Sequence, residues 1–270
     1  TAAVHAIVEQ QYALYNDKLM PAFLKAGIHI VSHGERNVAQ RQWVKQYFER
    51  EVRPLLIPVA LDPSHPFPQV ANKSLNFIVR LGGRDAFGRE NEIAIVKVPR
   101  VLPRLIRMPD KASVRGAAAR NVLVSISSII RAHLTDLFAG RTVEQFSQFR
   151  VTRHSDLAVD EEDVKNLRTA LRQGLVHRHY GQAVRLEVSS GCSGYLADFL
   201  LQQFDLPHQS LYRVHGPVNL VRLTQLIDLI NRPDLCFEPY EAVYPVQIQS
   251  GKSFFTQLQQ GDIIFHQPFE

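Results

Sequence analysis

The runs LNFIVRL (Leu75–Leu81) and EIAIVKV (Glu92–Val98) decide the fold class of this chain. Both are dominated by apolar and β-branched residues, which favour strands. Gly82-Gly83 and Gly88 lie between them and permit the left-handed backbone that tight connections use. We therefore predict an antiparallel hairpin near the middle of the sequence.

Upstream of this hairpin, apolar residues recur at the spacing of one helix face over Val4–Ala26 and Gln40–Val52. Pro21 predicts a kink in the first helix, and a short strand is expected over Ile28–Val31. Five prolines within residues 54–68 predict an extended connector.

Downstream of the hairpin, helices and strands are predicted to interleave, which indicates an α+β fold. The expected helices are Asn121–Phe138, Val159–His179, Tyr195–Phe204, Val218–Ile230 and Phe254–Gln259. The expected strands are Phe149–Arg153, Val184–Val188, Leu211–Val214 and Asp262–Phe265. We expect a two-layer mixed α/β head domain, preceded by part of a helical bundle.

The composition excludes several protein classes. Of the 270 residues, 45% are hydrophobic and 21% are charged, which is typical of a globular chain and not of a disordered one. No apolar run is long enough to cross a membrane. Cys192 and Cys236 cannot build a disulfide framework and are predicted to be buried free thiols in a reducing compartment. The net charge of +5 permits an anionic partner without requiring one.

Two short motifs resemble catalytic loops but lack a required residue. Ser250-Gly251-Lys252-Ser253 resembles the end of a phosphate-binding loop, yet Val246 stands where that loop needs glycine. We expect a solvated turn before a helix there. Gly191-Cys192-Ser193-Gly194 does not match a nucleophile elbow, and Ser193 is predicted to cap the following helix.

Candidate metal ligands are sparse. The pairs His29/His33 and His177/His179 have no cysteine or carboxylate at ligand spacing, so they do not predict a zinc site. The acidic run Asp160–Asp163 is explained by the start of a helix, where the backbone dipole favours negative charge.

Arginines are the remaining signal. Their guanidinium groups match phosphate oxygens, so arginines on the predicted strands and loops could line a channel for a polyanion. The alternative, scattered surface charge, stays open from composition. The arginines in question are Arg80, Arg84, Arg104, Arg107, Arg150, Arg153, Arg185 and Arg213, with Arg222 on a predicted helix.

Seven segments, in order along nearly the whole chain, resemble the bacterial-type polyphosphate kinase family. The clearest is LYRVHGPVNL (Leu211–Leu220), and FRVTRHSDL (Phe149–Leu157) and AVRLEV (Ala183–Val188) resemble two further runs of that family. The others are Tyr47-Phe48 with Arg53–Pro58, Asn76–Val79, Val98–Arg104 and Gly261–Phe269. His154 and Gln267 depart from the family pattern, which has Asn and His at those places.

The resemblance implies an enzyme that reversibly transfers the terminal phosphate of ATP to inorganic polyphosphate, using Mg²⁺ and a phosphorylated histidine. It also implies four domains, of which residues 1–37 would end the N-terminal helical domain. Residues 38–250 would form the head domain, and residues 251–270 a linker and the first strand of the C-terminal catalytic part. Both ends are expected to be cut, and no catalytic, ATP-binding or Mg²⁺-binding residue is assigned to these positions.

The resemblance further implies that this fragment is inactive by itself and contacts polyphosphate. Arg153, Arg222 and His266 are the candidate polyphosphate contacts. For Arg153, structural pairing with the acidic helix start at Asp160 is the alternative. The expected partners are polyphosphate, ATP or ADP and further copies of the chain, with no nucleic acid. The expected location is the cytoplasm, with peripheral membrane association left open. The alternative is a non-catalytic dimerisation or polyanion-binding module, and a nucleic-acid-binding role rests only on the net charge.

Overall fold

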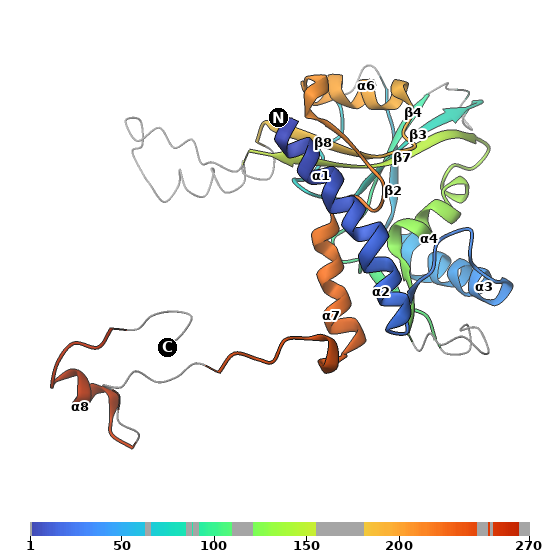
Figure 1. Cartoon of the computed structure of the whole chain (residues 1–270). Helices are drawn as coiled ribbons and strands as arrows, with labels where there is room; N and C mark the ends of the chain where they lie inside the picture. Colours follow the sequence, from blue (N-terminus) through green and yellow to red (C-terminus); the bar gives the residue numbers. More distant parts are fainter. Residues whose placement is uncertain are drawn as a thin grey trace, which may run out of the picture. The chain divides into compact units, whose positions relative to one another are not determined.

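The computed structural model describes residues 2–62, 66–84, 88, 92–109, 121–154, 181–241, 248 and 251–264 (Figure 1). The chain divides into two compact units, Thr1–Leu229 and Ile230–Glu270. Both sheets lie in the first unit. The division into residues 1–37, 38–250 and 251–270 stays a prediction.

A six-stranded sheet is the centre of the first unit, with the order β2-β4-β3-β7-β8-β9. Its strands are β2 (Ile57–Ala60), β3 (Asn76–Gly82), β4 (Ile93–Lys97), β7 (Thr142–Arg153), β8 (Ala183–Ser189) and β9 (Leu211–Val214). The predicted hairpin is confirmed, because β3 and β4 pair antiparallel with Ile78 opposite Ile95. All other neighbours are antiparallel except β8 and β9, which run parallel.

The sequence did not predict β2, which falls in the proline-rich connector. Pro58 lies within it, opposite Val96 of β4. The N–H of Leu61 donates to the carbonyl of Ile93 at 2.8 Å, so alternate N–H groups of this strand point toward β4. Position 58 therefore faces outward, where a proline removes no hydrogen bond of the ladder.

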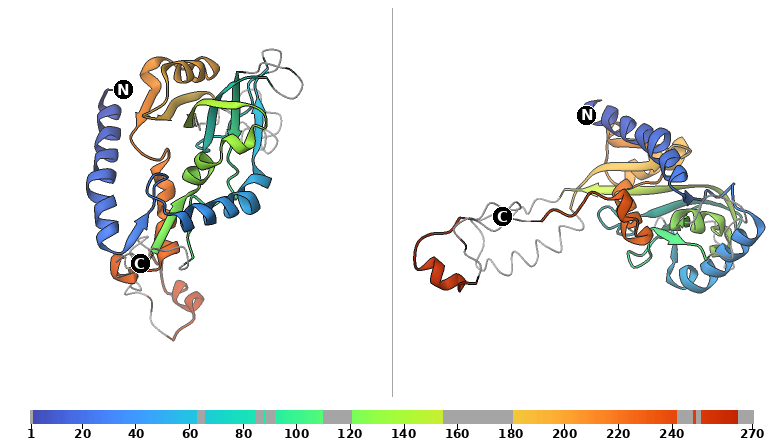
Figure 2. Two further views of the ribbon diagram at one scale, coloured as in Figure 1. Left: turned by 90° about the vertical axis from the view of Figure 1, so that its right-hand side faces the viewer. Right: turned by 60° about the horizontal axis from the view of Figure 1, so that its bottom comes forward.

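Parallel strands β8 and β9 are joined by helix α6 (Gly194–Gln203). The Oγ of Ser193 accepts a hydrogen bond from the N–H of Leu196 at 3.3 Å and so caps this helix, as predicted. The helix covers one face of the six-stranded sheet (Figure 2).

A second, three-stranded sheet has the order β1-β6-β5, formed by β1 (Ile28–Ile30), β5 (Leu105–Arg107) and β6 (Asn121–Ser125). The predicted helix over residues 121–138 is therefore wrong at both ends, because residues 121–125 form a strand and residues 133–138 are not α-helical, with a 3-10 turn at Thr135–Leu137. Asn121-Val122-Leu123-Val124 is buried between two strands, where β-branched residues pack well. Helix α4 (Ile126–Ala132) begins only where the Oγ of Ser125 accepts a hydrogen bond from the N–H of Ser128.

The first predicted helix consists of α1 (Ala2–Leu14), a π-helical turn (Tyr15–Leu19) and α2 (Met20–Lys25). The irregular turn precedes Pro21, which has no N–H to continue the regular ladder, and the N–H of Met20 instead bonds the carbonyl of Tyr15. Helix α1 borders β9, because the ring of His5 stacks on that of Tyr212 with their centres 4.0 Å apart. In the π-helical turn that follows α1, the Nδ2 of Asn16 donates to the carbonyl of His215, just after β9, at 2.8 Å.

The second predicted helix is α3 (Val38–Tyr47), followed by a π-helical turn (Phe48–Val52) and a 3-10 turn (Arg53–Leu55). A capping box starts it: the side chain of Asn37 accepts from the N–H of Gln40, and the side chain of Gln40 accepts from the N–H of Asn37.

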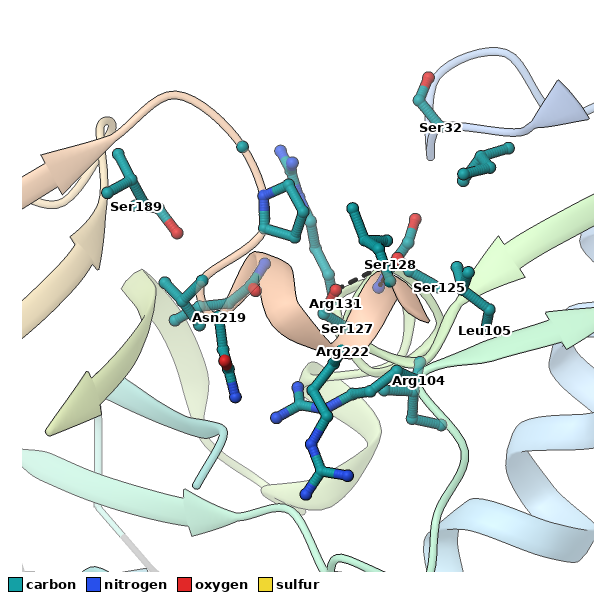
Figure 3. Close-up of a pocket in the computed structure, with 18 of the residues that line it drawn as sticks. Ser32, Arg104, Leu105, Ser125, Ser127, Ser128, Arg131, Ser189, Asn219 and Arg222 are labelled. Atoms are coloured by element: carbon teal, nitrogen blue, oxygen red, sulfur yellow. Dashed lines mark hydrogen bonds between the residues drawn. The ribbon is translucent and has the colours of Figure 1, made fainter. Parts of the chain in front are cut away.

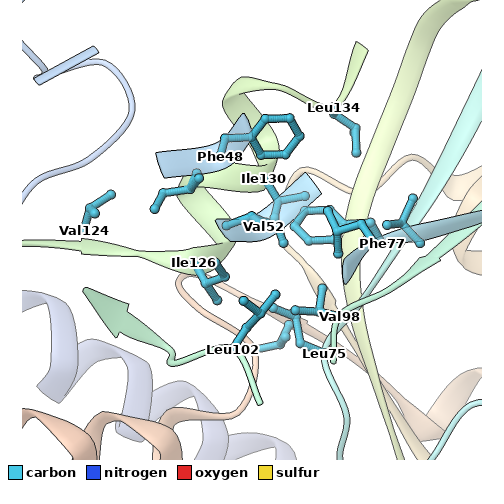
Figure 4. Close-up of a cluster of buried hydrophobic side chains, with 14 of the residues drawn as sticks. Phe48, Val52, Leu75, Phe77, Val98, Leu102, Val124, Ile126, Ile130 and Leu134 are labelled. Atoms are coloured by element: carbon cyan, nitrogen blue, oxygen red, sulfur yellow. The ribbon is translucent and has the colours of Figure 1, made fainter. Parts of the chain in front are cut away.

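The six-stranded sheet is buried on both faces, because successive side chains of a strand point to opposite sides. Phe77 and Val79 of β3 belong to a core shared with α3, α4 and the small sheet (Figure 4). Ile78 of the same strand belongs to a second core shared with α6. The α+β class is thus confirmed, and the small sheet adds a layer on the first face.

The C-terminal elements are a 3-10 turn (Leu220–Thr224), α7 (Gln225–Ile230), a 3-10 turn (Pro233–Leu235) and α8 (Phe254–Leu258). The predicted helix over 218–230 therefore starts as a 3-10 turn, and the helix after Ser253 is confirmed. Residues 262–264 are not in a strand, contrary to the prediction.

Some predictions lie outside the described residues: the helix Val159–His179, with Asp160–Asp163 and His177/His179, and the candidate contact His266. Both cysteines are free, but only Cys192 is buried, so the prediction of a buried thiol at Cys236 is wrong. In the part of the chain that the structure describes, no helix has the length and apolarity to cross a membrane.

Candidate functional site

A buried ion cluster joins the last three strands of the large sheet. Glu187 of β8 is only 3% exposed, and its carboxylate forms ion pairs with Arg150 of β7 and Arg185 of β8. The Arg185 guanidinium lies 4.1 Å from the ring centre of Tyr212 on β9. A buried carboxylate needs such partners, because an unpaired charge away from water is costly.

The cluster holds the turn after β9 through Asn219. The Nη1 of Arg150 donates to the Oδ1 of Asn219 at 2.7 Å, and the Nδ2 of Asn219 donates to the carbonyl of Lys73 at 3.3 Å. Asn219 has a left-handed backbone, with φ 68° and ψ 64°, which asparagine tolerates better than most residues. It immediately precedes the 3-10 turn that contains Arg222.

Gly216 and Pro217 complete this turn against α1. A Cβ atom at Gly216 would lie 3.1 Å from the ring of Tyr12, which is tighter than ordinary van der Waals contact, so the close approach favours glycine. The hydroxyl of Tyr12 donates to the carbonyl of Pro217 at 2.8 Å. Burial, followed by the charge of Glu187, raises the pKa of Tyr12, so its hydroxyl stays a proton donor at neutral pH.

Beside this turn lies a cleft of about 360 Å³, which we call the arginine cleft. It lies between the turn after β9, the start of α4 and the segment after β1 (Figure 3). Its cationic side chains are those of Arg104, Arg131 and Arg222. Six serines also line it: Ser32, Ser125, Ser127, Ser128, Ser189 and Ser190. None of the described residues that line the cleft is acidic.

Arg104 and Arg222 extend into the same part of the cleft (Figure 3). Burial, and then the charges of Arg222 and Arg150, lowers the pKa of the Arg104 guanidinium to about 10. Arg104 is therefore still charged at neutral pH. Within the described residues, neither Arg104 nor Arg222 forms an ion pair or a side-chain hydrogen bond. Two converging, uncompensated guanidinium groups favour an anion.

The predicted contacts do not come together. Arg222 lines the arginine cleft. Arg153, at the end of β7, donates from Nε to the carbonyl of Val70 at 3.1 Å and from Nη1 to that of Gly181 at 2.8 Å. Its guanidinium also lies 5.6 Å from the ring centre of Phe204, which belongs to the core under α6. It is therefore on the opposite face of the sheet from the cleft.

Sequence reasoning named Arg104 only as one of several scattered arginines, and it missed Arg131 and the serines. Arg104 and Arg222 lie far apart in the chain, and only the packing of the small sheet beside the turn after β9 brings them together. No local spacing marks such a pair. The described residues contain no group of three or more His, Cys, Asp or Glu side chains placed to hold a metal ion.

Residues 39–226 match the family model described as "Polyphosphate kinase middle domain". The chain belongs to the polyphosphate kinase family. A polyphosphate kinase of Neisseria meningitidis serogroup C is 45% identical over 270 residues, which cover 100% of this chain and 39% of that protein. A polyphosphate kinase of Pseudomonas aeruginosa is 43% identical over 267 residues, covering 99% and 38%.

The chain thus spans about two fifths of the length of these curated polyphosphate kinases. A crystal structure of polyphosphate kinase from Porphyromonas gingivalis has a similar fold, with a TM-score of 0.71 and 20% sequence identity. The likeness covers 98% of this chain and 37% of that one.

The three clearest segments of polyphosphate kinase character lie side by side as β7, β8 and β9 with the turn that follows. Arg150, Glu187 and Asn219 each belong to one of them. Three segments that resemble the family in sequence therefore build the cluster that holds the turn before Arg222.

Proposed function

We propose that this chain is the middle part of a polyphosphate kinase that reversibly transfers the terminal phosphate of ATP to inorganic polyphosphate. The phosphohistidine and the Mg²⁺ site of that reaction are assigned to parts of the protein outside these residues. The role of this chain is to bind the polyphosphate chain in the arginine cleft. The family membership and the names of the curated relatives support the reaction class.

One observation favours polyphosphate binding over a purely structural role. The cleft combines the uncompensated guanidinium groups of Arg104 and Arg222 with serine hydroxyls and no described carboxylate. Guanidinium groups donate paired hydrogen bonds to phosphate oxygens, and hydroxyl groups can donate to the same oxygens. A structural role alone would leave two like charges close together, with the Arg104 guanidinium desolvated and no compensating partner.

The lining residues do not fit Mg²⁺, which prefers carboxylate oxygens and water. We therefore assign no metal-dependent step to the cleft. Its residues hold and orient the anionic polymer by charge and hydrogen bonding. Transfer of the phosphoryl group further requires a nucleophile and groups that stabilise the developing charge.

The alternative, a non-catalytic polyanion-binding module, differs in its prediction for the longer protein. Both functions require this chain to bind polyphosphate, but only the first requires the full-length protein to phosphorylate a histidine from ATP. Assembly into homo-oligomers and a cytoplasmic location remain part of the proposal.

The binding test compares wild type with the double variant Arg104→Gln/Arg222→Gln and the matched control Lys18→Gln/Lys25→Gln. Lys18 and Lys25 are exposed cations on the N-terminal helices and line neither this cleft nor any other described pocket. Polyphosphate affinity is measured by calorimetry at two salt concentrations. We expect the arginine variant to lose at least about tenfold in affinity and to show a weaker salt dependence, since fewer counterions are released.

The control is expected to change polyphosphate affinity by less than about threefold, because exposed charges outside the site act only through screened fields. Equal losses in both variants, or no polyphosphate binding by wild type, would exclude the arginine cleft as the site. Histidine phosphorylation by the full-length protein, given ATP and Mg²⁺, then separates the kinase from the non-catalytic module.

A further inference from the structure

A second basic cavity lies next to the arginine cleft, on the side of α3. It has a volume of about 470 Å³, and we call it the α3 groove. Its basic lining residues are His33, Arg36, Arg41, Lys45 and His133, and none of its described lining residues is acidic. One lining residue is paired with a carboxylate, because the Oδ2 of Asp136 lies 2.9 Å from the Nδ1 of His133.

The α3 groove and the arginine cleft share a wall. His33 lines both cavities. The Nη2 of Arg36, in the groove, donates a hydrogen bond to the Oγ of Ser128, in the cleft. Arg131 of the cleft and His133 of the groove are two residues apart at the end of α4. The two cavities are therefore adjacent, with His33 at their junction.

Arg36 shows that the groove carries buried, uncompensated charge. The residue is only 2% exposed, and its Nε is buried without a hydrogen-bond partner. Within the described residues it forms no ion pair with a carboxylate. Burial lowers the pKa of its guanidinium to about 10, so Arg36 stays positive at neutral pH. Proteins rarely bury an arginine in this way unless a partner supplies negative charge.

Two exposed cations extend the groove outward. Arg41 and Lys45 are four residues apart on α3 and so lie on the same face of that helix. The Nε of Arg41 donates to the carbonyl of Arg36 at 2.9 Å, which fixes the Arg41 side chain beside Arg36 in the lining of the groove. Like charges four residues apart destabilise a helix, so helix stability does not explain why Arg41 and Lys45 occur together on this face.

The potential at the junction is positive as well. Burial, followed by the charges of Arg36, Arg131 and Arg41, lowers the pKa of His33. His33 is therefore neutral at physiological pH, and it can donate or accept a hydrogen bond without adding charge at the junction.

We propose that the α3 groove is a second anion subsite, which binds the stretch of a linear polyphosphate that extends beyond the arginine cleft. This inference rests on the proposed function, since it assigns the cleft to one part of the polymer and the groove to the next. It predicts that the groove contributes only to ligands long enough to span both cavities. Triphosphate fills the arginine cleft alone, whereas a long polyphosphate also contacts Arg41 and Lys45.

The test measures the affinity of the chain for triphosphate and for long-chain polyphosphate. Wild type is compared with Arg41→Gln/Lys45→Gln, Arg104→Gln/Arg222→Gln and Lys18→Gln/Lys25→Gln, which all remove two positive charges. Thermal unfolding of each variant verifies that the fold is kept. We expect Arg41→Gln/Lys45→Gln to lose about tenfold in affinity for long-chain polyphosphate and less than about twofold for triphosphate.

The remaining outcomes distinguish the two ideas. If wild type binds neither ligand, the proposed function fails and the inference fails with it. If Arg104→Gln/Arg222→Gln loses affinity but Arg41→Gln/Lys45→Gln matches wild type for long chains, only the inference fails. Equal losses for triphosphate and long chains in the groove variant would make the groove an independent site and overturn the continuous path. A loss in Lys18→Gln/Lys25→Gln as large as in the groove variant would reduce the effect to net charge and also overturn it.

Discussion

Replacing Glu187 by Gln tests the claim that a buried ion cluster holds the sheet and the turn beside the arginine cleft. The carboxylate of Glu187 is 3% exposed, whereas the side chains of its partners Arg150 and Arg185 are 13% and 24% exposed. The substitution keeps the shape and removes the negative charge. Two arginines are then left near each other with little water to solvate them.

Removing one partner from a buried ion pair costs about 3–5 kcal/mol. Because Arg185 retains some contact with solvent, we expect the lower end, about 3 kcal/mol of unfolding free energy. For a unit of this size, that corresponds to a fall of roughly 6–12 °C in the midpoint of thermal unfolding. The free energy is measured by urea unfolding followed by circular dichroism, and the midpoint by calorimetry.

Glu144→Gln is the matched control. The Oε2 of Glu144 lies 3.4 Å from the Nε of Arg80, but the Glu144 side chain is 47% exposed. An exposed pair of this kind contributes about 0–1 kcal/mol. Should Glu187→Gln cost no more than this control, the cluster is not what stabilises the three strands, and the structural role assigned to Glu187 is refuted.

Three further predictions follow from single features of the fold. Arg104→Met is expected to raise the unfolding free energy by about 1 kcal/mol, because a desolvated charge is removed, while polyphosphate affinity falls. The pKa of Arg104 is about 10 in the folded chain, below its value in the unfolded chain. The gain in unfolding free energy should therefore be present at pH 7 and shrink above pH 10, as measured by chemical unfolding. Asn219→Ala is expected to lower the unfolding free energy by about 2–3 kcal/mol, since it combines a strained left-handed backbone with two lost hydrogen bonds. Asn219→Gly should lower it by less, because glycine removes the strain. Equal losses of unfolding free energy in urea would contradict the role of backbone strain. In the native chain, a thiol reagent should modify Cys236 quickly and Cys192 only on unfolding, because Cys192 is buried and burial raises its thiol pKa. Mass spectrometry of the labelled peptides measures the order of modification, and faster labelling of Cys192 would contradict its burial.

The strands that the sequence predicted well are those whose own residues and flanking turns favour a strand, without information from distant parts of the chain. The hairpin of β3 and β4 has long apolar runs with glycines between them, and β9 is flanked by turn residues. The failure at Asn121–Ser125 has a physical cause. A short run rich in apolar residues fits a helix or a buried strand equally well. Only pairing with β1 and β5 selects the strand, and this pairing is not marked in the sequence, because both strands are three residues long and β1 lies far upstream in the chain.

The arginine cleft was harder to predict for a different reason. Arg222 was selected from the sequence together with Arg153, yet the pleat and the packing place these two arginines on opposite faces of the large sheet. Arg104 gains its importance from being desolvated next to Arg222, and desolvation is a property of the folded chain and not of a motif. The turn that orients Arg222 could be anticipated only from Gly216 and Asn219, the residue types that a close approach and a left-handed backbone favour.

Both edges of the six-stranded sheet are closed to further strands. At β9 the backbone is bordered by α1 and the π-helical turn after it, with contacts from His5 and Asn16 to the carbonyls of Gln209 and His215. At β2 the outward-facing position is Pro58, which offers an incoming strand no donor. Self-association of native chains should therefore proceed through side-chain surfaces and not by cross-chain strand pairing, so concentrated native protein should not seed amyloid-like fibres through this sheet.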